Sequence, residues 1–203
     1  MKAPVGVILA GGQARRMGGG DKALLRLGGV TLLDHVRARL DPQVAGLALN
    51  ANGDAARFDV GLPVLPDPVA GFVGPLAGVL AGLDWAAGLG ARHVVSAAAD
   101  TPFLPCDLVP RLLDAAEAAG TPIALAASGE PARLQPTFGL WPVALRDDLR
   151  AALTGGLRKI LDWTDRHGAA SAVWPATPFD PFFNINRPED LTRAGHYLKG
   201  ASA

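Results

Sequence analysis

The sequence is poor in features that define several common classes of protein. It contains one cysteine, Cys106, among 203 residues, which excludes an internal disulfide. The position of Cys106 at an expected helix start predicts a small packed residue. The 19 basic and 19 acidic residues cancel, so no general basic field is present to hold nucleic acid. Any anionic ligand must therefore be held by locally placed groups.

Long apolar runs are also missing. No run is long enough to span a bilayer, and the first residues lack the apolar segment of a secretory signal. The sequence therefore predicts a cytoplasmic protein that has neither a membrane nor a nucleic acid as its partner. A chain of this length can form one α/β domain with a substantial core, so we expect residues 1–203 to fold as a single domain.

What the sequence does contain is a glycine-rich segment directly after a short apolar run. Residues 5–9 read VGVIL, and residues 10–22 read AGGQARRMGGGDK. Glycines let backbone N–H groups approach phosphate oxygens closely, and oriented amides act as fixed partial positive charge. Arg15, Arg16 and Lys22 add full charges, although most basic clusters are solvated surface. We interpret the segment as a phosphate-binding loop.

Two better-known phosphate loops are excluded by the spacing. A Walker loop continues from Gly-Lys to Ser or Thr, whereas here Asp21 precedes Lys22 and Ala23 follows it. The hydroxyl that would bind magnesium is therefore missing. The dinucleotide fingerprint G-x-G-x-x-G is also absent from the start of the segment.

Short apolar runs alternate with helical patterns along most of the chain. We expect strands at 5–9, 46–49, 63–65, 93–98 and 123–126, and helices at 32–40, 75–89 and 108–119. Thr31 and Asp34 form a partial capping box for the first helix. The alternation predicts an α/β fold with a Rossmann-like, mostly parallel sheet and helices on both faces.

The pattern changes after residue 135. We expect strands at 137–141, 172–174 and 182–185, and helices at 143–153, 157–167 and from 188 onward. Some of these strands are predicted to be antiparallel edge pieces, so that the C-terminal part forms a small antiparallel portion beside the cleft.

Polar residues follow the predicted parallel strands. Ligands in such sheets bind at the carboxyl ends of the strands, so Asn50, Asp67 and Asp100 are expected to converge with the glycine-rich segment. Each has a purely structural alternative: Asn50 and Asp67 as turn residues, and Asp100 as a helix cap. A carboxylate at a strand end suits magnesium, which prefers hard oxygen ligands and keeps several waters, so Asp100 is the metal candidate.

The glycine-rich segment also matches the signature L-A-G-G-x-x-x-R-M-G-x-x-K, and here the sequence resembles the molybdenum cofactor guanylyltransferases. Further blocks in the order of that family follow it along nearly the whole chain. They are Asn50-Ala51-Asn52, Leu65-Pro66-Asp67, Gly74-Pro75-Leu76-Ala77-Gly78, Asp100-Thr101-Pro102, Gln135-Pro136-Thr137, Gly156-Leu157-Arg158-Lys159 and Asn184-Ile185-Asn186. The resemblance implies a fold like that of the nucleotide-diphospho-sugar transferases.

The resemblance implies guanylyl transfer from GTP to molybdopterin with Mg²⁺ as cofactor. Lys22, Asp100 and Arg16 would be the catalytic residues, and Asp100 would bind the metal. The GTP-binding residues implied are Leu9, Ala10, Gly11, Gly12, Lys22, Asn50, Asp67 and Asp100. Gly11 favours guanine, because related cytidylyltransferases have alanine at this position.

On the acceptor side the resemblance implies that Arg158, Asn184 and Asn186 bind the pterin, with Asn186 as a secondary metal candidate. The two asparagines alternate along an expected strand, so only one is predicted to point into the cleft. Arg158 has an alternative as an ordinary exposed helix residue. The terminal phosphate of molybdopterin is already anionic, which explains why no histidine stands out as a general base.

Two other functions remain open from the sequence. One is cytidylyl transfer to the same pterin, or nucleotidyl transfer to a sugar or polyol phosphate, which would share the loop and Asp100 but differ in the base pocket. The other is a carrier that delivers the pterin to a molybdoenzyme without chemistry. For the guanylyl transfer that the resemblance implies, transient contact with molybdoenzymes or their chaperones is expected beside the substrates GTP and molybdopterin.

Overall fold

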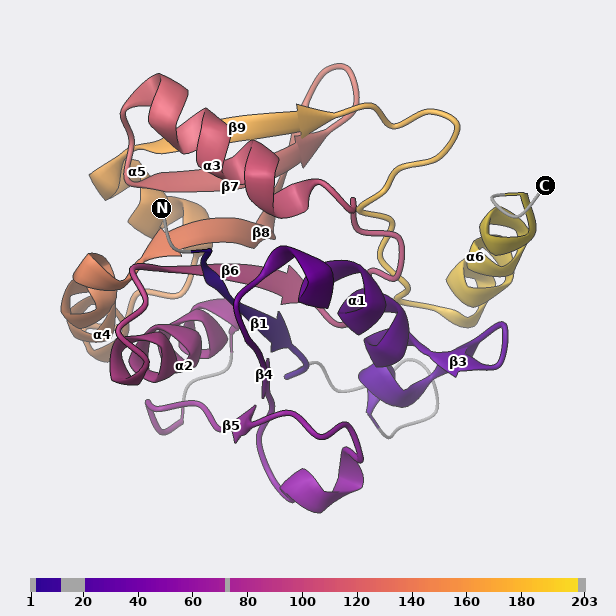
Figure 1. Cartoon of the computed structure of the whole chain (residues 1–203), viewed down its shortest axis with the longest axis horizontal. Coiled ribbons are helices and arrows are strands. Elements are labelled where there is room, and N and C mark those ends of the chain that lie inside the picture. The colour runs from indigo at the N-terminus through magenta and orange to yellow at the C-terminus, as the bar shows by residue number, and fades with distance from the viewer. Residues whose placement is uncertain (1–2, 12–20, 72–73, 201–203) are drawn as a thin grey trace.

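A seven-stranded sheet with helices on both faces forms the centre of the protein in a computed structural model (Figure 1). The structure describes residues 3–11, 21–71 and 74–200. The strands follow the order β5-β4-β1-β6-β8-β7-β9. Their bounds are β1 Val5–Leu9, β4 Leu47–Asn50, β5 Val64–Leu65, β6 His93–Ala98, β7 Ile123–Ser128, β8 Arg133–Pro142 and β9 Ala169–Trp174.

The sheet is mostly parallel, as the alternation of strands and helices predicts. β1 pairs in parallel with β4 and β6, β4 with β5, and β7 with β9. The register places Leu9 beside Asn50 on one side and Ala98 on the other. The last residues of three parallel strands therefore lie in one row at the carboxyl edge of the sheet.

Helices cover both faces because alternate strand residues point in opposite directions. Ile8 belongs to a core cluster with residues of α1 and α3, whereas its neighbour Val7 packs into a second cluster with α2, α4 and α5. α1 and α3 lie in front of the sheet in Figure 1. The helices are α1 Leu32–Leu40, α2 Pro75–Gly88, α3 Leu108–Ala119, α4 Arg146–Thr154, α5 Ile160–His167 and α6 Pro188–Gly200. The 3-10 turns are η2 Lys22–Leu24, η3 Asp41–Gln43, η4 Ala55–Arg57 and η5 Val143–Leu145.

The antiparallel strand of the large sheet lies inside it, so the expectation of an edge position was wrong. β8 is antiparallel to both of its neighbours, β6 and β7. A short connection after Ser128 turns the chain back, which makes β8 an antiparallel partner of β7. The chain then crosses through α4 and α5 and returns as β9, which is parallel to β7 and forms the edge.

A small hairpin precedes α1 and was not expected. β2 (Arg26–Leu27) and β3 (Val30–Thr31) pair in antiparallel fashion across Gly28 and Gly29, whose φ values are +61° and +89°. Two consecutive positive φ values suit the tight turn of a hairpin and favour glycine. The expected cap of α1 is confirmed, since the Thr31 side chain accepts a hydrogen bond from the Asp34 amide at 3.0 Å.

Two further expectations were wrong. Residues 182–185 form no strand and belong to an extended loop before α6. Cys106 is exposed rather than packed, and it lies in the turn that precedes α3. Within the described part of the chain, no helix is both long and apolar enough to cross a membrane.

Candidate functional site

A cavity of about 520 Å³ lies at the carboxyl edge of the sheet, where the topology predicts a ligand site. Residues from strand ends, from the segment beyond β4 and from the start of α2 meet there. The described residues that line it are Leu9, Ala10, Gly11, Asp21, Asn50, Asn52, Arg57, Asp67, Gly74, Pro75, Ala98, Asp100, Thr137 and Asn184. α2 begins at Pro75 beside this cavity, and the N-terminal end of a helix favours bound anions.

Lys22 is held at one end of the cavity by three side-chain oxygens from distant parts of the chain. Its Nζ donates to Asp100 Oδ2 at 2.5 Å, to Asn186 Oδ1 at 2.5 Å and to Asn184 Oδ1 at 3.1 Å. An ammonium group has three donors, so these acceptors satisfy all of them. Lys22 is only 8% exposed. The three oxygens therefore form a cation site in which the ammonium group is the cation.

Asn184 and Asn186 both reach Lys22, which corrects the expectation that only one would point into the cleft. The alternation rule does not apply, because these residues lie in a loop and not in a strand. The intervening Ile185 is fully buried, and its N–H donates to the carbonyl oxygen of Asp100 at 3.0 Å. Asp190 accepts from the Asn186 amide at 3.0 Å. These backbone contacts hold the loop so that the side chains of Asn184 and Asn186 both face Lys22 Nζ.

A second polar cluster surrounds Asp67 farther along the cavity. The buried Asn50 donates from Nδ2 to Asp67 Oδ1 at 2.9 Å and to the carbonyl of Leu65 at 3.0 Å. Asn52 makes two hydrogen bonds with the same aspartate. Its Nδ2 donates to Asp67 Oδ2 at 2.8 Å, and its Oδ1 accepts from the backbone N–H of Asp67 at 2.9 Å. The carboxylate is thus fixed in orientation, and its oxygens retain lone pairs for a ligand.

Sequence reasoning did not assign roles to Asn52, Asp21 or Arg57, all of which line the cavity. The signal for Asn52 is its spacing of two residues from Asn50, within a block already singled out. Arg57 has no comparable signal, because its place depends on the path of the segment between β4 and β5.

Leu9 at the end of β1 and the next two residues, Ala10 and Gly11, line the cavity wall. A Cβ added at Gly11 would meet no heavy atom within 4 Å among the described residues. Crowding by the described residues therefore does not require glycine at this position. Gly12 and Arg16 lie outside the described residues, so their expected roles stay predictions.

Arg158 lies in a different groove, formed between the end of α4 and the start of α5. This groove shares no residue with the cavity among the residues described as lining either one. Arg158 donates from Nη1 to the carbonyls of Leu153 and Leu157 at 3.1 and 2.7 Å. In the same groove, the pKa of Asp148 is lowered, chiefly because Trp163 donates a hydrogen bond to its carboxylate. Burial opposes this shift, and a hydrogen bond with His167 adds to it. The expected pterin-binding role of Arg158 stays a prediction.

No cluster of three or more His, Cys, Asp or Glu side chains suited to a metal occurs in residues 3–11, 21–71 and 74–200. A divalent cation at the cavity would instead meet one carboxylate, Asp100, and the amide oxygens of Asn184 and Asn186. All three are hard oxygen ligands. Magnesium is commonly bound through one or two carboxylates while it retains waters, so this donor set fits it.

The fold and the cavity together define a nucleotide-binding α/β protein of the nucleotidyltransferase type. A family model described as MobA-like NTP transferase domain matches residues 6–170. The chain therefore belongs to this family, and the resemblance noted from the sequence is confirmed.

Curated relatives match over nearly the whole chain. A molybdenum cofactor guanylyltransferase from Bradyrhizobium sp. (strain ORS 278) is 56% identical over 193 residues, covering 93% of this chain and 90% of the relative. One from Mesorhizobium japonicum (strain LMG 29417 / CECT 9101 / MAFF 303099) is 50% identical over 204 residues, covering 98% and 97%.

Solved structures share the fold. Molybdopterin-guanine dinucleotide biosynthesis protein A from Archaeoglobus fulgidus superposes with a TM-score of 0.73 and 26% identity, covering 97% of this chain and 99% of that one. The 2-C-methyl-D-erythritol 4-phosphate cytidylyltransferase from Thermus thermophilus gives 0.69 and 23%, covering 98% and 100%. The expected fold class is confirmed by these neighbours.

Close packing of α2 against the cavity generates a first prediction. A Cβ added at Gly78 would lie 2.2 Å from Asn50 Oδ1 and 2.7 Å from Leu9 Cδ2, whereas one at Gly88 in the same helix would meet nothing within 4 Å. We expect Gly78→Ala to lower the free energy of unfolding by about 1–3 kcal/mol, because overpacking displaces neighbours. Gly88→Ala should be neutral or slightly stabilising. Urea titration of both variants tests this, and equal stability of the two would contradict it.

Proposed function

We propose that this protein transfers GMP from GTP to the terminal phosphate of molybdopterin, forming the guanine dinucleotide of the pterin and releasing pyrophosphate. The observation that carries the proposal is the presence of two different polar ends in one cavity. Asp67 is a fixed acceptor at one end, and Lys22 with Asp100 forms a charged cluster at the other. The names of the curated relatives support the same reaction.

Guanine suits the Asp67 end because of its hydrogen-bonding edge. Guanine presents a ring N–H and an amino group side by side, and a carboxylate can accept from both. Cytosine presents acceptors at the corresponding ring positions, which would oppose a carboxylate that is held in place by Asn50 and Asn52. Leu9, Ala10 and Gly11 would form the wall against which the base lies.

The charged end would hold the triphosphate for in-line displacement at the α-phosphorus. The attacking phosphate of the pterin is anionic, so the main barrier is repulsion between two phosphates, which preplaced cations lower. Mg²⁺, held by Asp100 with Asn184 and Asn186, would neutralise charge on the phosphates. Lys22 would turn from the three oxygens toward the β- and γ-phosphates. Arg16 is proposed as a further cation and Gly12 as a backbone donor.

The acceptor phosphate would lie near Lys22, where Asn184 and Asn186 meet. Asn184 lines the cavity and Asn186 lies beside it at Lys22, so both can contact an incoming pterin phosphate. Arg158 is proposed to bind the pterin from its own groove. We further propose that residues 1–203 act as one domain, in the cytoplasm, and that molybdoenzymes or their chaperones receive the product.

The base preference is tested by measuring pyrophosphate release with molybdopterin as the acceptor. We expect rapid release with GTP and release slower by at least about a hundredfold with CTP, since a mismatched base leaves the polar groups of the pocket unpaired. Equal or faster release with CTP would favour the cytidylyl reaction. Release with a sugar phosphate in place of the pterin would favour the wider nucleotidyltransferase interpretation.

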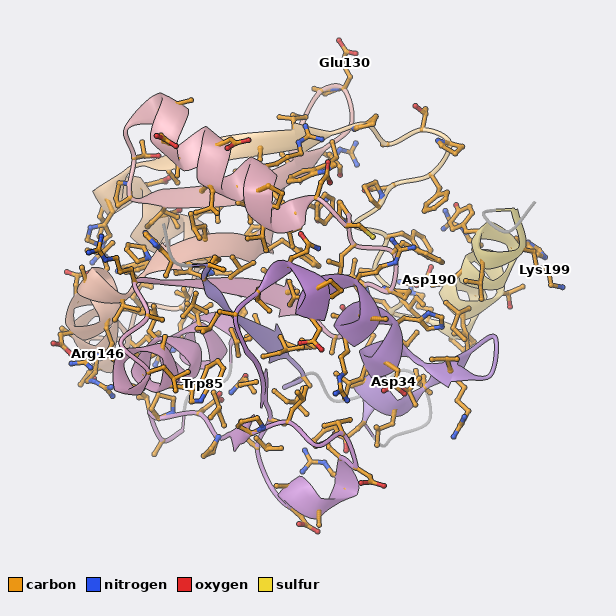
Figure 2. The ribbon with its side chains drawn as sticks, viewed as in Figure 1. Asp34, Trp85, Glu130, Arg146, Asp190 and Lys199 are labelled. Atoms are coloured by element: carbon orange, nitrogen blue, oxygen red, sulfur yellow. The ribbon has the colours of Figure 1, made fainter. Side chains whose placement is uncertain are left out.

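The two charged residues are tested by substitutions that preserve size. We expect Lys22→Met and Asp100→Asn each to lower kcat by about a hundredfold or more, because each removes electrostatic stabilisation of the transition state. Lys199→Met on α6 and Glu130→Gln at the β7–β8 turn are controls, and Figure 2 shows both side chains far out on the surface. An Asp100→Asn variant that binds GTP normally and still delivers active cofactor would favour the carrier.

Competition between Lys22 and a metal for the same oxygens gives a binding prediction that needs no turnover. We expect Lys22→Met to bind Mn²⁺ without nucleotide on the order of tenfold more tightly than the wild type, because the competing positive charge is gone. Electron paramagnetic resonance of free Mn²⁺ measures this, with Lys199→Met as the matched control. Unchanged or weaker binding in Lys22→Met would mean that the three oxygens are not the metal site.

A further inference from the structure

Arg57 lines the cavity and contacts both the segment that carries Lys22 and the segment that follows β4. Its Nε donates to Asp21 Oδ2 at 2.5 Å, and its Nη2 donates to the carbonyl oxygen of Asn52 at 2.6 Å. Its Nη1 donates to the carbonyl oxygen of Asp54. Arg57, Asp21 and Asn52 all line the cavity. One guanidinium group therefore joins residues that are 36 and 5 positions away in the sequence.

Two of these contacts, those with Asp21 and Asn52, lead directly to a group with a proposed role. Asp21 immediately precedes Lys22 at the end of the glycine-rich segment. Asn52 holds Asp67 through both its side-chain amide nitrogen and its oxygen. Arg57 thus connects, through hydrogen bonds, the residue next to Lys22 with the residue that holds Asp67.

The guanidinium group is itself fixed in place. It lies 4.3 Å from the ring centre of Phe58, which is buried against the main core cluster. The side chains of Arg57 and Asp21 are 28% and 24% exposed. Donation in three directions needs the planar fork of arginine, and a lysine ammonium cannot reproduce it. A partly exposed ion pair contributes little to the stability of the fold. We therefore expect the Arg57–Asp21 pair to matter through the positions in which it holds its neighbours.

We propose that Arg57 is a positioning residue for GTP, which sets the distance between the base-reading Asp67 and the phosphate-binding Lys22 through Asn52 and Asp21. This inference rests on the proposed function for the identity of the nucleotide. Arg57 acts on nucleotide binding and not on the reacting atoms, because its printed partners are Asp21, Asn52 and Asp54, and it does not itself contact Lys22 or Asp100.

The test is a double-mutant cycle between Arg57 and Asp21. We expect Arg57→Gln and Asp21→Asn each to raise KM and Kd for GTP by about tenfold, with kcat changed less than about threefold. The Kd for GTP of the double variant should be no higher than that of the single variant with the higher Kd, since both substitutions break the same contact. Arg57→Lys should recover only part of the loss, because it restores the charge without the fork.

Arg37→Gln is the matched control. Arg37 in α1 donates from Nη1 to the carbonyl of Val60 at 2.6 Å, so it braces the same segment from outside the cavity. We expect its KM and kcat to stay at the wild-type values. Thermal melting of every variant separates loss of folding from loss of binding, and Arg57→Lys serves where Arg57→Gln does not fold.

The outcomes distinguish this inference from the proposed function. Additive losses in the double variant would show that Arg57 contacts the nucleotide independently of Asp21, and unchanged Kd in Arg57→Gln would remove its role altogether. Either result overturns the inference, as does a loss confined to kcat. A wild-type protein that binds GTP but transfers no GMP would defeat the proposed function, and the cycle measured on Kd would still decide the role of Arg57.

Discussion

The site depends on one buried positive charge and the three oxygens that surround it. Lys22, Asp100, Asn184 and Asn186 come from the beginning, middle and end of the chain, and they meet within hydrogen-bonding distance. A buried ammonium group is costly unless it is paired and its donors are satisfied. The fold must therefore hold these segments in register, and the rest of the architecture can be understood from that requirement.

Each part of the fold supports that cluster. Parallel pairing of β6 with β1 places Asp100 beyond the end of β6, next to the segment that follows β1. The small cluster of Leu27, Leu32, Phe103, Ile185 and Ala194 packs the hairpin and α6 together, and its buried Ile185 separates the two asparagines. α6 lies to one side of the sheet in Figure 1, beside β3. This helix thus anchors the loop that carries Asn184 and Asn186.

Much of the fold followed from local patterns. The bounds of β1, β6, α1 and α3 match the expected ranges, because each has a clear apolar period and a recognisable start or end. The interior position of β8 depends on which strands pair across the sheet, and local periodicity carries no such information. The loop at 182–185 has the composition of a strand, but Ile185 is buried beneath the site instead of in a sheet.

Part of the candidate site also followed from the sequence, and part did not. Strand ends located Asn50, Asp67 and Asp100 because parallel topology brings such ends to one edge. The joint contact of Asn184 and Asn186 with Lys22, and the bridge made by Arg57, required the tertiary structure.

A crystal structure with GTP and Mn²⁺ bound tests the account most directly. We expect guanine beside Asp67, the triphosphate against Lys22 and the other residues of the glycine-rich segment, and an anomalous peak from Mn²⁺ within ligand distance of Asp100. Guanine placed away from Asp67, or a metal coordinated without Asp100, would contradict it.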